Sequence, residues 1–206
     1  MTELLTDGPA NAKTIFAFAH GAGGAMDTPF MTKVAQQMAS HGVRVVRFEF
    51  PYMAARRTGA KKGGAPDRAP VLLDTWREVV GQLGAKGKRI AIGGKSLGGR
   101  MASMVADELE VAALVCFGYP FHPPGKPDQM RTAHLETLKT PALILQGERD
   151  PFGSRDDVAQ YNLSKSIRVE WMPDGDHSLK PRASSGFTEK QHLERAATLA
   201  AEFVAR

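Results

Sequence analysis

The sequence predicts an α/β fold, with a mostly parallel sheet of about six strands and helices on both faces. Short apolar segments rich in β-branched residues alternate along the chain with longer segments of helical periodicity. The strand segments are apolar throughout, as expected for strands that are covered on both faces. The length of 206 residues and the hydrophobic content of 42% predict one domain over residues 1–206, with no insertion long enough for a large lid.

The elements follow one another in a regular order. The predicted strands are residues 14–19, 43–48, 89–93, 112–117, 142–146 and 168–172. The predicted helices are residues 28–41, 69–83, 97–109, 154–164 and 189–205. Two irregular segments rich in proline and glycine, residues 51–70 and 119–128, each follow a strand. Ligands bind outside the carboxyl ends of the strands in open α/β sheets, so these segments are expected to form walls of a site.

The charge of the chain does not favour nucleic-acid binding. The net charge is +5, but lysines and arginines are spread along the chain and aromatic residues make up only 7%. One basic cluster, Arg56, Arg57, Lys61 and Lys62, lies in the segment 51–70. It is interpreted either as a solvated loop or as a surface that faces an anionic group of a substrate.

Neither metal nor disulfide chemistry is indicated. The single cysteine, Cys116, lies in an apolar run and is expected to be a small buried residue. The six histidines form no paired ligand motif, so no metal and no cofactor are expected. The first residues lack the pattern of a signal peptide and no apolar run spans a membrane, which predicts a cytoplasmic protein with no membrane partner.

The most informative motif is Gly94-Lys-Ser-Leu-Gly98, directly after the strand 89–93. It fits the pattern Gly-x-Ser-x-Gly, in which a sharp turn from strand to helix exposes the central serine above the sheet. Ser96 is therefore a candidate nucleophile. A phosphate-binding loop would need glycine at position 89, where Arg89 stands. A dinucleotide-binding fingerprint after the first strand is incomplete, because Met26 occupies its third glycine position.

A serine nucleophile needs a base, and the base needs a carboxylate to orient it. Asp150 follows the strand 142–146 and His177 follows the strand 168–172, so acid and base come after Ser96 in the order of α/β hydrolases. Alternatives remain open at this point. Asp150 could instead cap the next helix, and His177 could be an exposed loop residue. Glu148, Asp174 and Asp176 are the other candidates for the orienting acid.

The developing oxyanion needs backbone N–H donors. One is expected from Leu97, the residue after the nucleophile. The other is expected from Ala22 or Gly23, in the glycine-rich segment that follows the first predicted strand. The alternative is that these glycines serve only the packing of a helix.

Together these residues resemble the α/β-hydrolase superfamily, and within it the compact branch of dienelactone-hydrolase-like and KANL3/Tex30-like proteins, over nearly the whole chain. The motifs that carry the resemblance are His20-Gly-Ala-Gly-Gly, Arg47-Phe-Glu-Phe-Pro-Tyr, Gly93-Gly-Lys-Ser-Leu-Gly-Gly-Arg-Met-Ala-Ser, Gly118-Tyr-Pro-Phe-His-Pro-Pro-Gly-Lys-Pro, Gln146-Gly-Glu-Arg-Asp-Pro-Phe-Gly and Asp176-His-Ser. The resemblance implies Ser96 as nucleophile, Asp150 as acid and His177 as base. Dienelactone hydrolases use cysteine where this chain has Ser96, which argues against a dienelactone substrate.

The function expected from these residues is hydrolysis of a small ester or thioester through an acyl-enzyme. Tyr52, Met53, Tyr119, Phe121 and His122 lie on the two irregular segments and are expected either to shape a shallow pocket or to anchor the loops. Two alternatives are kept. One is an interaction module that retains the fold, because relatives in the branch include a subunit of a chromatin-modifying assembly. The other is peptidase or acyltransferase chemistry on the same residues.

Overall fold

A computed structural model describes residues 2–60, 62–84, 87 and 89–206. Within this part of the chain a seven-stranded sheet has the order β1-β3-β2-β4-β5-β6-β7. Its strands are β1 (Leu4–Asp7), β2 (Thr14–Ala19), β3 (Arg44–Phe48), β4 (Arg89–Lys95), β5 (Ala113–Phe117), β6 (Ala142–Gly147) and β7 (Ile167–Met172). The helices are α1 (Pro29–Ser40), α2 (Pro51–Arg57), α3 (Ala69–Leu83), α4 (Leu97–Val105), α5 (Arg155–Val158) and α6 (Glu189–Ala205), with short 3₁₀ turns at Ala133–Leu135 and Ala183–Ser185.

All strand pairs are parallel except the one that β1 forms with β3. Strand β2 pairs with β3 on one side and with β4 on the other, in registers that set Ala19 opposite both Phe48 and Gly94. The chain therefore leaves β2 in one direction and then returns to its other side. Such a reversal of strand order opens a crevice at the carboxyl ends of the strands.

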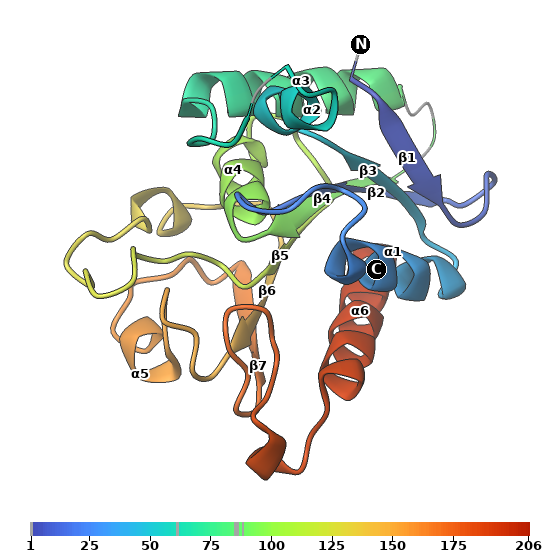
Figure 1. Ribbon diagram of the computed structural model, residues 1–206. Helices are drawn as coiled ribbons and strands as arrows, with labels where there is room; N and C mark the ends of the chain where they lie inside the picture. Colours follow the sequence, from blue (N-terminus) through green and yellow to red (C-terminus); the bar gives the residue numbers. More distant parts are fainter. Residues whose placement is uncertain (1, 61, 85–86, 88) are drawn as a thin grey trace.

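Two layers of helices cover the sheet (Figure 1). Helices α1 and α6 pack against one another and bury one face, while α3 and α4 cover the opposite face. Helix α1 buries Met31, Val34, Ala35 and Met38, which recur at the three- and four-residue spacing that aligns side chains on one side of a helix. Strand β2 buries all six of its residues, as expected for a central strand of a doubly covered sheet.

The predicted fold class is confirmed, with corrections to individual elements. Strand β1 was not predicted because it is short, only half-buried and antiparallel at the sheet edge. The segment 51–70 is not wholly irregular, since Pro51 starts α2, and proline is favoured in the first turn of a helix. The helix predicted over residues 154–164 ends at Val158, and the helix predicted over residues 97–109 ends at Val105. No helix among the described residues has both the length and the apolar character that a membrane crossing requires.

Candidate active site

Ser96 stands at the turn between β4 and α4, in a backbone conformation that non-glycine residues rarely adopt. Its φ is 49° and its ψ is −114°. The turn is tight enough that a Cβ atom on Gly94 would lie 2.6 Å from the backbone of Gly98, and one on Gly98 would lie 2.6 Å from the carbonyl oxygens of Ala19 and His20. Glycine is thus required at both places, which is the local reason for the Gly-x-Ser-x-Gly pattern.

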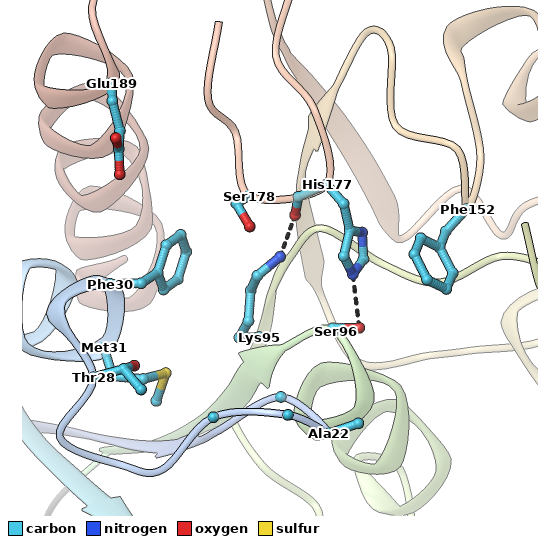
Figure 2. Close-up of a pocket in the computed structure, with 13 residues that line it drawn as sticks. Ala22, Thr28, Phe30, Met31, Lys95, Ser96, Phe152, His177, Ser178 and Glu189 are labelled. Atoms are coloured by element: carbon cyan, nitrogen blue, oxygen red, sulfur yellow. Dashed lines mark hydrogen bonds between the residues drawn. The ribbon is translucent and has the colours of Figure 1, made fainter.

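The imidazole of His177 joins Ser96 to Asp150. His177 Nε2 lies 2.8 Å from Ser96 Oγ, as the dashed line in Figure 2 shows, and His177 Nδ1 lies 2.8 Å from Asp150 Oδ2. Since a carboxylate only accepts, Nδ1 carries the proton and Nε2 is left to accept the hydrogen bond of the serine hydroxyl. The structure therefore brings together the three residues that the sequence predicted as nucleophile, base and acid.

Asp150 is fully buried, and its carboxylate is held by several donors. Oδ1 accepts from the amide of Phe152 at 2.9 Å, and Oδ2 accepts from Gln146 Nε2 at 2.8 Å. A buried charge is tolerated only when it is hydrogen-bonded in this way. Asp150 does not cap α5, because Ser154 and Asp157 form the capping box of that helix.

The other carboxylates considered from the sequence have different partners. Glu148 accepts from the amide of Asp174 at 3.0 Å. Asp174 pairs with Arg182, whose hydrogen bonds lower the pKa of Asp174 to about 2. Asp176 accepts from the amide of Ser178 at 2.7 Å within its own turn. Within the described residues, none of these three carboxylates accepts a hydrogen bond from the ring of His177.

The predicted oxyanion donors lie around Ser96. Leu97 is the first residue of α4, and Ala22 and Gly23 line the cavity beside Ser96. In the described part of the chain, the amides of Ala22 and Leu97 have no hydrogen-bond acceptor. Both amides are thus free to bind an oxygen that develops negative charge.

His20 and Tyr52 fix the loop that carries Ala22 by hydrogen bonds to its carbonyl groups. The amide of Phe50 donates to His20 Nε2 at 3.1 Å, so His20 Nδ1 carries the proton and donates to the carbonyl of Gly21 at 2.7 Å. Burial lowers the pKa of His20 below 6.5, which favours this neutral form. The hydroxyl of Tyr52 donates to the carbonyl of Ala22 at 3.1 Å. Hydrogen bonds therefore fix the carbonyls of Gly21 and Ala22, whereas the amide of Ala22 has no acceptor among the described residues.

A half-open cavity of about 430 Å³ lies beside Ser96 (Figure 2). Phe152 packs against the imidazole of His177, with 4.2 Å between ring centres. Several lining residues were not singled out from the sequence, because they come from the start of α1, the start of α6 and residues next to the predicted triad. These are Thr28, Phe30, Met31, Lys95, Phe152, Ser178 and Glu189. Adjacency to Ser96, Asp150 and His177 was the available signal for Lys95, Phe152 and Ser178.

The residues predicted to shape the pocket do not line this cavity. Tyr52, Met53, Tyr119, Phe121 and His122 are all at least nine-tenths buried. The two aromatic segments fold inward and pack in the core on the α3 and α4 side of the sheet, with Tyr52 and Met53 on α2. The expectation that they contact substrate is therefore corrected in favour of the alternative, anchoring of the loops.

The basic cluster also lies away from the cavity. Arg57 pairs with Glu49 at 2.6 Å and with Asp27 at 2.9 Å, so its charge is neutralised by the protein itself. The guanidinium of Arg56 donates to a backbone carbonyl of the following loop. Lys61, the third member of the cluster, lies outside the described residues. The solvated-loop interpretation fits the arginines better than a substrate contact.

Cys116 is buried, and burial raises the pKa of its thiol, so it behaves as the small apolar residue that was expected. Among the described residues, no group of three or more histidine, cysteine, aspartate or glutamate side chains is placed to hold a metal ion.

Comparison with known proteins identifies the family. The model of the α/β-hydrolase domain family matches residues 12–205. A dienelactone hydrolase from Anabaena variabilis superimposes with a TM-score of 0.76 at 21% identity, covering 99% of this chain and 91% of that chain. A serine hydrolase homologue from Coxiella burnetii gives a TM-score of 0.72 at 20% identity, covering 98% and 90%. A lidless α/β serine hydrolase from Xanthomonas campestris gives 0.67 at 19% identity, covering 97% and 89%. These likenesses extend over the whole fold, and the narrower KANL3/Tex30-like branch stays a prediction.

Proposed function

The chain belongs to the α/β-hydrolase family, and from that premise we propose that it is a serine hydrolase that cleaves a carboxylic ester or thioester of a small substrate. The observation that carries the proposal is the hydrogen-bonded series from Ser96 through His177 to Asp150, which opens into a cavity at its serine end and is buried at its carboxylate end. Nucleophile, base and orienting acid require this arrangement.

In the first half-reaction, Ser96 Oγ attacks the carbonyl carbon of the ester while His177 Nε2 takes the serine proton. The carbonyl oxygen becomes an oxyanion, which the amides of Leu97 and of the Ala22–Gly23 segment stabilise. Asp150 stabilises the imidazolium that forms. Collapse of the tetrahedral intermediate breaks the ester bond, and His177 returns the proton to the departing alcohol.

In the second half-reaction, water replaces the alcohol. His177 removes a proton from the water, whose oxygen attacks the acyl carbon of the acyl-enzyme. A second tetrahedral intermediate uses the same amides, and its collapse releases the acid and returns the proton to Ser96. The hydrogen bonds that fix the carbonyls of Gly21 and Ala22 support this role, because donors that are held in place need no rearrangement as charge develops.

The test is labelling of the purified protein by a fluorophosphonate, with hydrolysis of 4-nitrophenyl acetate followed in the same samples. Wild-type protein is expected to be labelled and to turn over the ester, and Ser96→Ala is expected to lose both. Ser103→Ala is the matched control, since Ser103 also bonds a histidine but is buried away from the cavity. It is expected to keep both signals.

Absence of labelling and turnover in folded wild-type protein would contradict the proposal and favour an interaction module. A panel of matched ester, thioester and amide substrates separates esterase from peptidase chemistry. Product analysis with an added alcohol separates hydrolysis from acyl transfer.

A further inference from the structure

The cavity beside Ser96 holds a positive charge that the proposed mechanism does not use. Lys95 directly precedes Ser96, and its side chain stands in the cavity wall between Phe30 and His177 (Figure 2). The ammonium lies 5.4 Å from the centre of the Phe30 ring and donates a hydrogen bond to the backbone carbonyl of His177. These two contacts hold the ammonium at the wall of the cavity. Without them, a lysine side chain tends to extend its charged end toward bulk water.

Most of the hydrogen-bonding capacity of this ammonium is unused. A lysine has three N–H donors, and among the described residues the His177 carbonyl is its one protein acceptor. No carboxylate in that part of the chain lies within ion-pair distance of Lys95, although Asp150 and Asp176 act on it from farther away. Burial lowers the pKa of Lys95 to about 8 and those two carboxylates oppose the shift, so the group is mostly charged at neutral pH.

The start of α1 adds a second source of positive potential on the same cavity. Helix α1 has 12 residues and no acidic residue in its first turn. Thr28, the residue before it, lines the cavity and makes no side-chain cap hydrogen bond. The N-terminal end of a helix attracts anions through its free amides and its dipole.

One lining residue has the opposite charge. Glu189 lies on the side of the cavity away from Ser96 (Figure 2), and its carboxylate is 4.0 Å from the ammonium of Lys180. Its side chain is 45% exposed, so water screens its charge. Of the lysine and the glutamate that line the cavity, Lys95 is therefore the one whose charge water screens less.

Building on the proposed function, we propose that the substrate carries an anionic oxygen group, such as a carboxylate, in the part that occupies the cavity, and that Lys95 binds it. The anion would accept from the N–H donors that the protein leaves free. An interaction between charged groups in a partly desolvated site favours a charged substrate over a neutral one of equal length by about tenfold to hundredfold.

The test compares wild-type turnover of charged and neutral esters in a pH-stat. Monomethyl succinate, glutarate and adipate carry the charge in the acyl part, and methyl butyrate, valerate and hexanoate are their neutral counterparts. Acetyl esters of hydroxy acids against alkyl acetates place the charge in the alcohol part. We expect at least one charged ester to exceed its neutral counterpart about tenfold in kcat/KM, with the excess falling as salt is raised.

Two variants assign the preference to Lys95. Lys95→Met keeps the length of the side chain and is expected to bring the charged-to-neutral ratio near one, whereas Lys95→Arg is expected to keep most of it. Equal losses on both substrates in Lys95→Met would overturn the inference and leave Lys95 as a support of the His177 loop. The inference would also be overturned if the wild-type protein shows Ser96-dependent turnover but hydrolyses the charged and the neutral ester of every pair equally well.

A binding measurement separates this inference from the proposed function. Calorimetric titration of monomethyl glutarate into Ser96→Ala needs no turnover, and binding is expected to weaken at least tenfold in Ser96→Ala/Lys95→Met. If the wild-type protein hydrolyses no ester but binding still depends on Lys95, the hydrolase proposal alone is contradicted. Absence of Lys95-dependent binding for the charged esters of both series would contradict the inference alone.

Discussion

A serine at each end of helix α4 shares a hydrogen bond with a histidine. The two pairs have similar hydrogen bonds but differ in their neighbouring charged groups and in their access to the cavity. Ser96, before the first turn, lies 2.8 Å from His177 Nε2. Ser103, near the last turn, also lies 2.8 Å from His134 Nε2. The distance between serine and histidine therefore does not distinguish the two pairs.

The second histidine has the wrong neighbours for a base. The Nδ1 atom of His177 donates to the carboxylate of Asp150, which orients the ring. His134 lies near the guanidinium of Arg100, and burial together with that charge lowers the pKa of His134 below 6.5. Asp107, the first acidic residue after α4, accepts hydrogen bonds from the amide and the hydroxyl of Thr140 instead.

Access differs as well. Ser96 lines a cavity, whereas Ser103 is 3% exposed and shares its hydroxyl with Tyr119 at 3.2 Å. A serine and a histidine that share a hydrogen bond can act as nucleophile and base only with a carboxylate next to the histidine and open space next to the serine. The second pair is a polar network that joins α4 to the loop after β5.

Removing each histidine in turn is expected to give the largest difference in activity between the two pairs. His177→Ala is expected to lower kcat about 10,000-fold or more, because serine then has no base. His134→Ala is expected to leave kcat within a factor of about three, since it touches no group in the cavity. Steady-state kinetics on the best ester, with circular dichroism to verify folding, measures both. A comparable loss in folded His134→Ala would assign catalysis to the second pair.

Replacing the two carboxylates is the next largest change. Asp150→Asn is expected to lower kcat about 1,000- to 10,000-fold, because an amide favours the wrong tautomer of His177. Asp107→Ala is expected to keep kcat and to lower the free energy of unfolding by about 1 kcal/mol, because the backbone amides of Lys139 and Thr140 lose their acceptor. Kinetics and urea unfolding on both variants separate the two roles. Retained activity in Asp150→Asn would require another acid.

Gln146 connects the two regions and gives a smaller, graded effect. Its Oε1 accepts from the amide of Tyr119 at 2.7 Å, and its Nε2 donates to Asp150. Gln146→Leu is expected to lower kcat about tenfold, since the carboxylate loses one of its donors. Tyr119→Phe removes only the hydroxyl that faces Ser103, and is expected to leave kcat unchanged. Equal kinetic effects of the two substitutions would mean that the second network supports catalysis directly.

Some parts of the molecule could be predicted from the sequence, and others could not. Parallel strands and the order of Ser96, Asp150 and His177 follow from apolar runs and from the residues at strand ends, which are local features. The cavity walls do not, because Phe30 and Glu189 come to the cavity only through the packing of α1 and α6. Aromatic residues on irregular loops gave a misleading signal.

That misleading signal has a physical cause. Tyr119 and Phe121 lie on a loop without regular structure, and such loops usually cover the surface. Here both side chains turn inward and are fully buried, and the Tyr119 hydroxyl is satisfied by Ser103 and His134. Sequence shows that an aromatic residue is present but not which side of a loop it faces, since that depends on partners distant in the chain.

The smallest expected effect concerns the stability of the second pair as pH falls. The pKa of His134 is lowered in the folded state by burial and by Arg100, while an unfolded histidine titrates near 6.5. Above pH 6.5 the imidazole is neutral in both states, and its hydrogen bonds to Ser103 and Tyr119 contribute fully. Below pH 6.5 the unfolded chain binds a proton that folded His134 resists, so that contribution is lost as pH falls toward the folded pKa.

His134→Gln cannot titrate and tests this directly. The wild-type advantage in free energy of unfolding is expected to be largest at pH 7 to 8 and to shrink toward pH 5.5, measured by urea unfolding at each pH. His20, whose pKa is also lowered, is present in both proteins, so its effect cancels in the difference. An advantage that grows in acid would mean that folded His134 takes up the proton despite Arg100. The second pair would then be able to hold the charge that catalysis requires, and the distinction between the two ends of α4 would rest on access and on Asp150 alone.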